Sequence, residues 1–225
     1  MRVLTWNLFH GRAQPPAGRD LLGEFCSLLA AWPWDVAMLQ EVPPWWPEPL
    51  ARACAAEQRT ALTSRNSLLA LRRALARRRP DLMKSNGGGA NAVLARLPVA
   101  SSRSVRLRAW PERRVAQLVR LEDGTVIANF HATTRIPLAE QELERLAALA
   151  LSCAGEAPLV LGGDLNLRAP RPAPELVHVA ARDVDHLFAA RLERRGEQTL
   201  HARHVELNGR LVELSDHPPL EVELL

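Results

Sequence analysis

Short apolar segments recur along the chain, and many of them end in an amide, a carboxylate or an imidazole. These ends are Trp6-Asn7, Leu39-Gln40-Glu41, Asn129-Phe130-His131, Asp164-Leu165-Asn166, Val184-Asp185-His186-Leu187 and Ser215-Asp216-His217. Successive side chains of a strand point to opposite faces, so Asn129 and His131 share one face. Asp164 and Asn166 share a face for the same reason. Sheets whose strand ends converge at one edge would gather these groups into a single polar site.

Strand and helix patterns alternate in the first half of the chain, and strands dominate the second half. The predicted helices are Asp20–Ala31, Pro47–Glu57, Ser67–Arg78 and Leu138–Cys153. The predicted strands are Met1–Leu8, Asp35–Gln40, Asn91–Ala95, Val99–Leu107, Val115–Leu121, Val126–His131, Pro158–Leu161, Asp185–Ala189, Thr199–His204 and Pro219–Leu224. Strands before and after helices, with hairpins between them, predict two packed sheets flanked by helices.

The composition is that of a globular protein, with 47% hydrophobic and 24% charged residues among 225. We expect one domain over residues 1–225. No apolar run approaches the roughly 20 residues that cross a membrane, and the N-terminus lacks a signal-peptide core. We therefore expect a cytoplasmic protein with no membrane partner. Cys26, Cys54 and Cys153 are widely spaced and predict neither a disulfide nor a zinc site.

Arginine supplies the positive charge almost alone, since Lys84 is the only lysine among 29 basic residues and the net charge is +4. The arginines crowd two segments, 72–79 and 103–120. Clustered guanidinium groups suit phosphate, which they bind through paired hydrogen bonds. A solvated helix face, or a genome-wide preference for arginine, would give the same clusters. Charge alone does not decide between these interpretations.

The polar ends, taken in order, resemble the endonuclease/exonuclease/phosphatase family, the metal-dependent phosphohydrolases related to DNase I. The matching segments are Thr5-Trp6-Asn7-Leu8, Leu39-Gln40-Glu41-Val42, 91–98, Asn129-Phe130-His131, Gly163-Asp164-Leu165-Asn166, 184–188 and 215–220. They cover essentially the whole chain. The resemblance implies an α/β (α+β) fold, a four-layer αββα sandwich of two packed mixed sheets flanked by helices. Its active site would lie where strand ends of both sheets converge.

The residue types agree with phosphodiester hydrolysis, which needs neutralised phosphate charge and an activated water. Glu41 and Asp216 are hard oxygen ligands for Mg²⁺ or Mn²⁺, and Asn7 completes or orients the metal's surroundings. Asp164 would orient or deprotonate the attacking water, and Asn166 would hydrogen-bond a phosphate oxygen.

The resemblance also assigns a hydrogen-bonding partner to His217 and names residues that would contact the phosphate. It implies that Asp185 fixes the tautomer of His217 and that His131 donates a hydrogen bond to the phosphate. Arg113 or Arg114 would bind phosphate, and the sequence does not choose between them; Asn91 is a further candidate. The remaining histidines, at positions 10, 178, 186, 201 and 204, match no site position, and Trp45 and Trp46 are interpreted as core or lid residues.

These features predict a monomeric phosphodiesterase dependent on Mg²⁺ or Mn²⁺, most readily a nuclease acting on DNA or RNA, with no protein partner. A phosphatase or lipid phosphodiesterase of the same fold is the alternative within the enzymes. A non-catalytic nucleic-acid-binding module is the alternative from another class, but it would be expected to lack a metal ligand or the Asp–His pair. His131-Ala132-Thr133 departs from the pattern of abasic-site repair enzymes, and Val184-Asp185-His186-Leu187 departs from that of inositol-polyphosphate 5-phosphatases.

Overall fold

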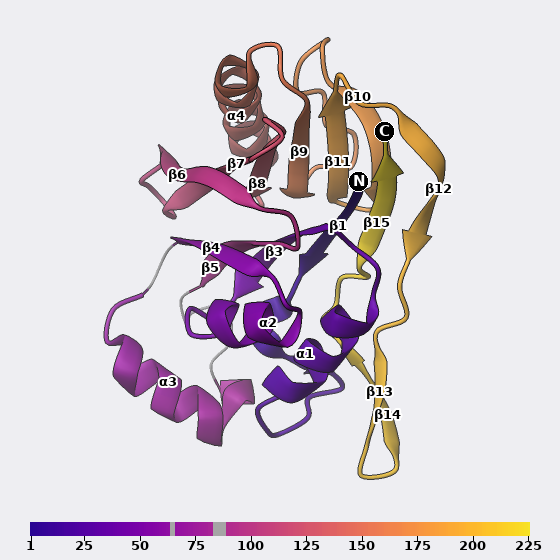
Figure 1. Cartoon of the computed structure of the whole chain (residues 1–225). Coiled ribbons are helices and arrows are strands. Elements are labelled where there is room, and N and C mark those ends of the chain that lie inside the picture. The colour runs from indigo at the N-terminus through magenta and orange to yellow at the C-terminus, as the bar shows by residue number, and fades with distance from the viewer. Residues whose placement is uncertain (64–65, 83–88) are drawn as a thin grey trace.

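The computed structural model describes residues 1–63, 66–82 and 89–225, and in these residues two six-stranded mixed sheets pack face to face (Figure 1). The first sheet has the order β12 (Arg194–Leu200), β15 (Leu220–Leu224), β1 (Arg2–Asn7), β3 (Val36–Val42), β5 (Ala90–Ala95) and β4 (Glu57–Leu62). The second has the order β10 (Val177–Arg182), β11 (Asp185–Ala190), β9 (Leu159–Asp164), β8 (Val126–His131), β7 (Arg114–Leu121) and β6 (Val99–Arg108).

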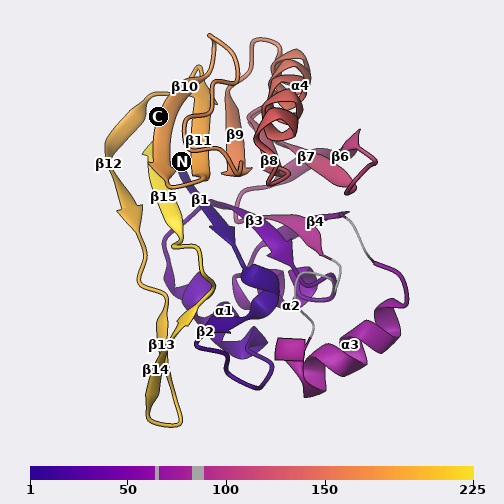
Figure 2. The same cartoon turned by 180° about the vertical axis from the view of Figure 1, so that it is seen from behind.

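Helices cover the outer faces of the two sheets. The first sheet carries α1 (Leu22–Ala31) and α2 (Pro47–Ala53), and the second carries α4 (Ile136–Ala154). Seen from either side, α3 (Leu69–Arg78) lies apart from the sheets at the lower edge of the molecule (Figures 1 and 2). A small sheet joins β13 (His204–Leu207), β14 (Arg210–Leu214) and β2 (Ala13–Gln14). The predicted four-layer αββα sandwich is confirmed. No helix in the described part of the chain is long and apolar enough to cross a bilayer.

Alternation along the strands builds an apolar layer on each side of both sheets. On β1, Leu4 and Trp6 pack under the helices, while Val3 packs between the sheets. On β8, Phe130 packs under α4, and Ile127 packs between the sheets. The side chains that follow Val3 and Ile127 on the same faces become polar toward the ends of these strands. The space between the sheets is therefore apolar at one end and polar at the other.

Buried amides join the two sheets beneath that polar end. Gln40 Nε2 on β3 donates to Asn129 Oδ1 on β8 at 2.8 Å. The Asn129 amide donates in turn to the carbonyl oxygens of Leu39 and Ala92, at 3.1 and 3.0 Å. Buried polar groups of this kind are stable only when paired, so these bonds fix how one sheet sits on the other.

Strand β4 was not predicted, and the helix expected over Pro47–Glu57 ends at Ala53. Ala55 has a positive φ of 51°, which turns the chain out of the helix. Glu57–Leu62 then pairs with β5 as an edge strand whose side chains are largely accessible. An edge strand of this kind lacks the apolar alternation on which the prediction relied.

The C-terminal strands also differ from the prediction. The strand expected over Thr199–His204 is split between β12, which ends at Leu200, and β13, which begins at His204. β2, β10 and β14 are not predicted, and most of β12 and β13 lies outside the predicted range. β12 is an exposed, arginine-rich edge strand, so apolar alternation does not mark it. Asn208 and Gly209 both have positive φ and form the turn between β13 and β14, a hairpin signal that the Asn-Gly pair carries in the sequence.

We predict that Gly163→Ala will destabilise the fold by about 2 kcal/mol or more, because φ is +127° and a Cβ would lie 2.0 Å from the carbonyl oxygen of Phe130. Gly23→Ala is the control. Gly23 lies in α1, and a Cβ added there would have no neighbouring atom within 4 Å, so this change should raise stability by about 0.5–1 kcal/mol. Urea unfolding of the two variants measures both effects. Equal stabilities would contradict the steric argument.

Candidate active site

The polar strand ends meet at one edge because of the directions of the strands. β1 and β3 are parallel, so Asn7 and Glu41 lie at the same end of the first sheet. β8 and β9 are parallel in the second sheet, which brings His131 level with Asp164. β11 runs antiparallel to β9, so its first residue, Asp185, pairs with Asp164.

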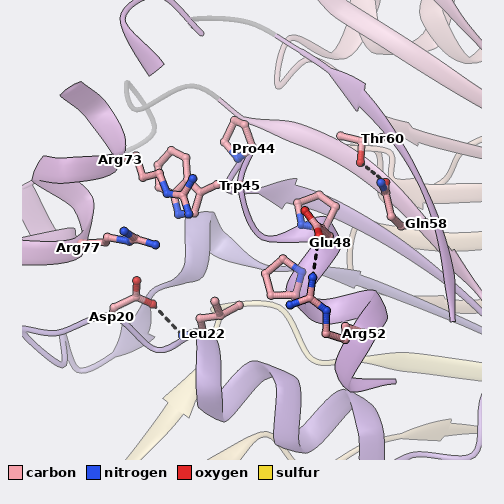
Figure 3. Close-up of a pocket in the computed structure, with 12 residues that line it drawn as sticks. Asp20, Leu22, Pro44, Trp45, Glu48, Arg52, Gln58, Thr60, Arg73 and Arg77 are labelled. Carbon is pink, nitrogen blue, oxygen red and sulfur yellow. Dashed lines mark hydrogen bonds and ion pairs between the residues drawn. The ribbon is translucent and has the colours of Figure 1, made fainter. Parts of the chain in front are cut away.

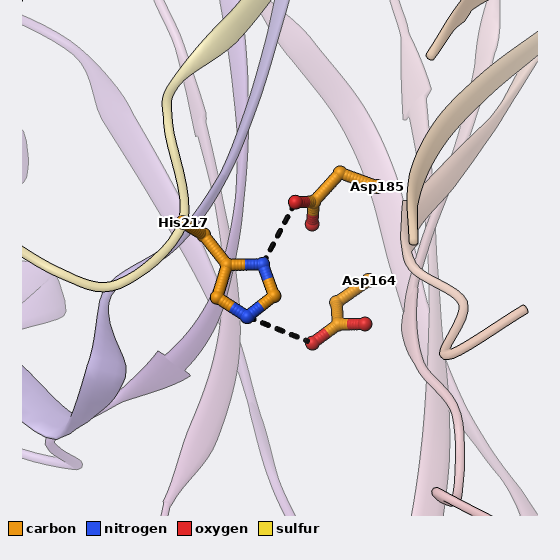
Figure 4. A group of neighbouring side chains, drawn as sticks. All are labelled: Asp164, Asp185 and His217. Atoms are coloured by element: carbon orange, nitrogen blue, oxygen red, sulfur yellow. Dashed lines mark hydrogen bonds and ion pairs between the residues drawn. The ribbon is translucent and has the colours of Figure 1, made fainter. Parts of the chain in front are cut away.

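Asp185 and His217 form a close hydrogen-bonded pair beside Asp164 (Figure 4). His217 Nδ1 donates to Asp185 Oδ2 at 2.7 Å, and His217 Nε2 lies 3.9 Å from Asp164 Oδ2. Burial lowers the pKa of His217, but the hydrogen bond to Asp185 and the surrounding carboxylates outweigh it and raise the pKa to about 9. Burial raises the pKa of Asp185. The imidazole is thus held in one orientation, with Nε2 directed toward Asp164.

Asp164 is almost wholly buried, and both of its oxygens accept hydrogen bonds. Asn7 Nδ2 donates to Oδ2 at 2.8 Å, and the backbone N–H of Asn166 donates to Oδ1 at 3.1 Å. Burial raises the pKa of Asp164, while the His217 charge and these hydrogen bonds lower it. Asn166 has a positive φ of 52°, and its side-chain amide donates to the carbonyl of Ala132 at 2.9 Å. Asn7 and Asn166 therefore hold Asp164 through different oxygens.

Glu41 reaches the site because β3 loses its regular form there. The pairing of β3 with β5 is irregular between Leu39 and Val42, and Glu41 has a positive φ of 50°. His10 Nε2 lies 3.2 Å from Glu41 Oε2, and His131 Nε2 lies 4.0 Å from Oε1. Burial, together with the charges of Asp164 and Asp216, raises the pKa of Glu41 to about 7.

His131 and Arg114 lie on the opposite wall. His131 Nε2 is 3.5 Å from Asp164 Oδ2, and burial and the Arg114 charge hold the pKa of His131 well below its usual value. Arg114 is buried and binds Glu112, and its charge lowers the pKa of Glu41, whereas Arg113 is exposed. The structure thus places Arg114, of the two candidates, toward the site.

Asn91 and Asp216 lie at the margins of the site. Asn91 is buried on β5 and donates to the carbonyl of Val115 at 3.1 Å, a bond that ties β5 to β7. Asp216 is about a third exposed, and its charge contributes to the raised pKa of Glu41. The loop that carries it is anchored by Ser215, whose hydroxyl donates to the carbonyl of Asn7 at 2.6 Å.

The donor set fits a hard divalent cation. Several carboxylates crowd one buried region, and the raised pKa of Glu41 reflects both their burial and their mutual repulsion. Glu41 and Asp216 offer oxygen ligands of the kind that Mg²⁺ and Mn²⁺ take. Asp164, Asp185 and His217 also bring one ligand atom each within 4.8 Å of one another, but there the His217–Asp185 hydrogen bond already engages two of the three groups.

Two features of the site were missed from the sequence. His10 lies beside Glu41, in a short turn that starts where the backbone N–H of Phe9 donates to Asn7 Oδ1 at 2.9 Å. Asparagine is a recognisable sequence signal for such a turn, because its side chain accepts a hydrogen bond from the backbone two residues later. The second feature is Ser215, which anchors the loop that carries Asp216; the motif Ser215-Asp216-His217 does not reveal this role. The other histidines have structural partners: His178 bonds His186, and His201 and His204 pair with glutamates.

Comparison with known proteins agrees with this geometry. The model of the endonuclease/exonuclease/phosphatase family matches residues 4–217. An endonuclease/exonuclease/phosphatase from Beutenbergia cavernae superposes with a TM-score of 0.73 at 18% identity, covering 100% of this chain and 71% of that one. A mannosyl-6-phosphatase from Bacteroides thetaiotaomicron gives 0.74 at 13% identity, covering 100% and 99%. TDP2 from Caenorhabditis elegans gives 0.68 at 14%, covering 99% and 73%.

No curated protein matches the sequence. The solved structures are distant enough in sequence that they establish the shared fold alone. The family model, in contrast, spans nearly the whole chain and includes every strand end described above. The chain therefore belongs to the endonuclease/exonuclease/phosphatase family.

Proposed function

We propose that the protein is a divalent-metal-dependent phosphodiesterase whose substrate is a nucleic acid. Membership of the family supports hydrolysis of a phosphoester bond. The observation that carries the proposal is the His217–Asp185 pair, which faces the buried carboxylate of Asp164 across 3.9 Å. In this arrangement the carboxylate can orient and deprotonate water, and the imidazolium beside it can stabilise the negative charge that develops on phosphate.

In this proposal Asp164 orients the attacking water and accepts its proton. Asn7 and Asn166 keep Asp164 in position through the hydrogen bonds described above. Water attacks phosphorus, the P–O ester bond breaks, and the leaving oxygen takes a proton from solvent. His217, kept protonated by Asp185, donates a hydrogen bond to the phosphate oxygen on which negative charge develops.

Other side chains bind the phosphate. His131 is neutral because its pKa is well below the usual value, so it donates one N–H without adding charge. Arg114 supplies a fixed positive charge on the same wall. A Mg²⁺ or Mn²⁺ ion held by Glu41 and Asp216 would neutralise phosphate charge and polarise the scissile bond.

We predict that EDTA will abolish hydrolysis and that Mg²⁺ or Mn²⁺ will restore it. Glu41→Gln should weaken metal binding, because it removes a charged oxygen ligand, while leaving the melting temperature close to that of the wild type. Glu140→Gln, on the exposed side of α4, is the matched control and should behave as the wild type. Isothermal titration with Mn²⁺ measures the affinity directly. Full activity after exhaustive chelation would exclude the metal site.

Asp185→Asn and His217→Ala should each lower kcat by about 10² to 10⁴, because the two residues act as one unit. The double variant should be little worse than either single variant, since removing one partner already disables the other. Steady-state kinetics, scaled to the folded fraction, gives the three values. Losses that multiply in the double variant would show that the residues act separately.

A substrate panel tests the nucleic-acid assignment. With Mg²⁺ or Mn²⁺ present, plasmid DNA or RNA should be cleaved with a higher kcat/KM than bis-p-nitrophenyl phosphate, a phospholipid or a hexose 6-phosphate. The exposed arginines would add phosphate contacts that small esters cannot use. Faster turnover of the sugar phosphate or of the phospholipid would instead identify a phosphatase or a lipid phosphodiesterase.

A further inference from the structure

Helix α3 lies in the segment that connects β4 to β5, and the two ends of this segment meet beside the candidate active site. The backbone N–H and the hydroxyl of Thr63 both donate to the carbonyl of Gly89, at 3.1 and 2.8 Å. A Cβ on Gly89 would lie 3.4 Å from the ring of His10, which itself contacts Glu41. The segment thus starts and ends next to His10, which contacts Glu41, one of the side chains proposed to bind metal.

Four of the five arginines at residues 72–79 divide into two groups, and the fifth, Arg72, donates to the carbonyl of Ser67 at 2.6 Å. Arg73 and Arg77 are one helical turn apart on α3 and point toward the loop that follows β3 (Figure 3). Arg78 and Arg79 lie at the C-terminal end of the helix and line none of the described cavities. The arginine cluster at residues 72–79 is therefore divided in the structure, and only Arg73 and Arg77 line a described cavity against the rest of the protein.

A cavity of about 630 Å³ separates Arg73 and Arg77 from the body of the protein. Its opposite wall includes Pro44 and Trp45, and Gln58 and Thr60 of β4 add polar groups (Figure 3). A neighbouring cavity of about 530 Å³ is bounded by the same two arginines together with Pro44 and Trp45. The volume is that of a small-molecule or nucleotide site.

The charges inside the cavity are not balanced. Three arginines and two carboxylates line it, a net charge of +1: Glu48 is paired with Arg52 at 2.7 Å, and Asp20 accepts the backbone N–H of Leu22 at 2.9 Å but keeps its charge. Arg73 and Arg77, by contrast, have no ion-pair or hydrogen-bond partner for their side chains anywhere in residues 1–63, 66–82 and 89–225. Two unpaired guanidinium groups on one wall suit an anion, and paired N–H donors suit phosphate in particular.

Trp45 adds the second element of a recognition site. Trp45 is partly buried, packs against the core of the first sheet and borders both cavities, whereas Trp46 lies within the core. An accessible indole beside two guanidinium groups matches a nucleotide, whose base stacks on aromatic rings. Trp45 lies four residues after Glu41, on the loop that follows β3, so the cavity borders the loop that leads away from the proposed metal ligand.

We infer that the cavity between α3 and the Pro44–Trp45 loop is a nucleotide subsite for the substrate strand. Arg73 and Arg77 bind a phosphate of a nucleotide next to the one being cleaved, and Trp45 stacks on its base. This inference rests on the proposed nuclease function and adds to it the part of the protein that grips the strand.

The test compares two variants that remove the same charge from the same segment, Arg73→Gln/Arg77→Gln and Arg78→Gln/Arg79→Gln. Binding of a fluorescent single-stranded oligonucleotide is measured by anisotropy in EDTA, where no turnover occurs. The first variant should raise Kd at least about tenfold and lower the slope of log Kd against log salt by about 0.7 for each lost phosphate contact. The second variant should bind nearly as the wild type does.

Trp45 is tested in parallel. Trp45→Ala should weaken binding about tenfold, and Trp45→Phe, which keeps an aromatic face, should recover most of it. All variants should melt within a few degrees of the wild type, and all should hydrolyse bis-p-nitrophenyl phosphate with unchanged kcat. Arg73→Lys/Arg77→Lys serves where the glutamine variant fails to fold; it should bind more weakly than the wild type because it loses the paired donors.

The outcomes separate the subsite from the proposed function. If nucleic acid is cleaved but the two double variants lose affinity equally, the subsite is wrong and the nuclease function stands. If the wild type hydrolyses only small esters and does not bind the oligonucleotide, both fail. If α3 variants instead lose binding to phosphatidylglycerol vesicles and keep oligonucleotide binding, the helix belongs to a lipid-binding face and the subsite is overturned.

Discussion

The hydrogen bond between Gln40 and Asn129 is the contact on which the rest of the molecule depends. Apolar packing holds the two sheets together but allows them to slide, because the hydrophobic effect has no direction. The amide pair has both direction and a cost if it is broken, since Asn129 Oδ1 would be left buried without a hydrogen bond. It therefore sets the position of the His131 end of one sheet against the Asn7 end of the other. The candidate active site depends on this contact for its geometry.

The same edge of the molecule has to hold several carboxylates that repel one another. Burial and neighbouring charges raise the pKa of Glu41 and Asp185, and burial raises that of Asp164, so the folded chain is under electrostatic strain there. Asparagine side chains, an arginine and a loop anchored by hydrogen bonds hold these groups in place without neutralising all of them. The excess negative charge is what makes a divalent cation a natural occupant, and it explains why so much of the local hydrogen bonding is devoted to orientation.

Period-two alternation and polar strand ends predict two packed sheets flanked by helices and a cluster of polar groups, whereas the four-layer αββα sandwich is implied by the resemblance to the family. Asn7 ends a strand of the first sheet, and Asp164 and Asp185 are paired strand ends of the second, so the packing of the two sheets brings them together. Other features depend on conformations that residue type does not reveal. Glu41 needs a left-handed backbone, and the choice between Arg113 and Arg114 depends on which of two neighbouring residues faces inward, which only the strand pairing decides. The edge strands β4 and β12 lack an apolar face, so the prediction misses β4 and includes only the last two residues of β12.

The hydrogen bonds between Thr63 and Gly89 mark off the segment that connects β4 to β5 from the two sheets that carry the candidate site. The sheet hairpin of β4 and β5 is complete at that point, so the length and composition of what lies between can vary without disturbing the register of either strand. Insertions at such a point carry little entropic penalty, because loop closure depends only weakly on length. Related proteins could therefore bind different molecules by exchanging the segment between β4 and β5. The residues that break the ester bond would stay the same.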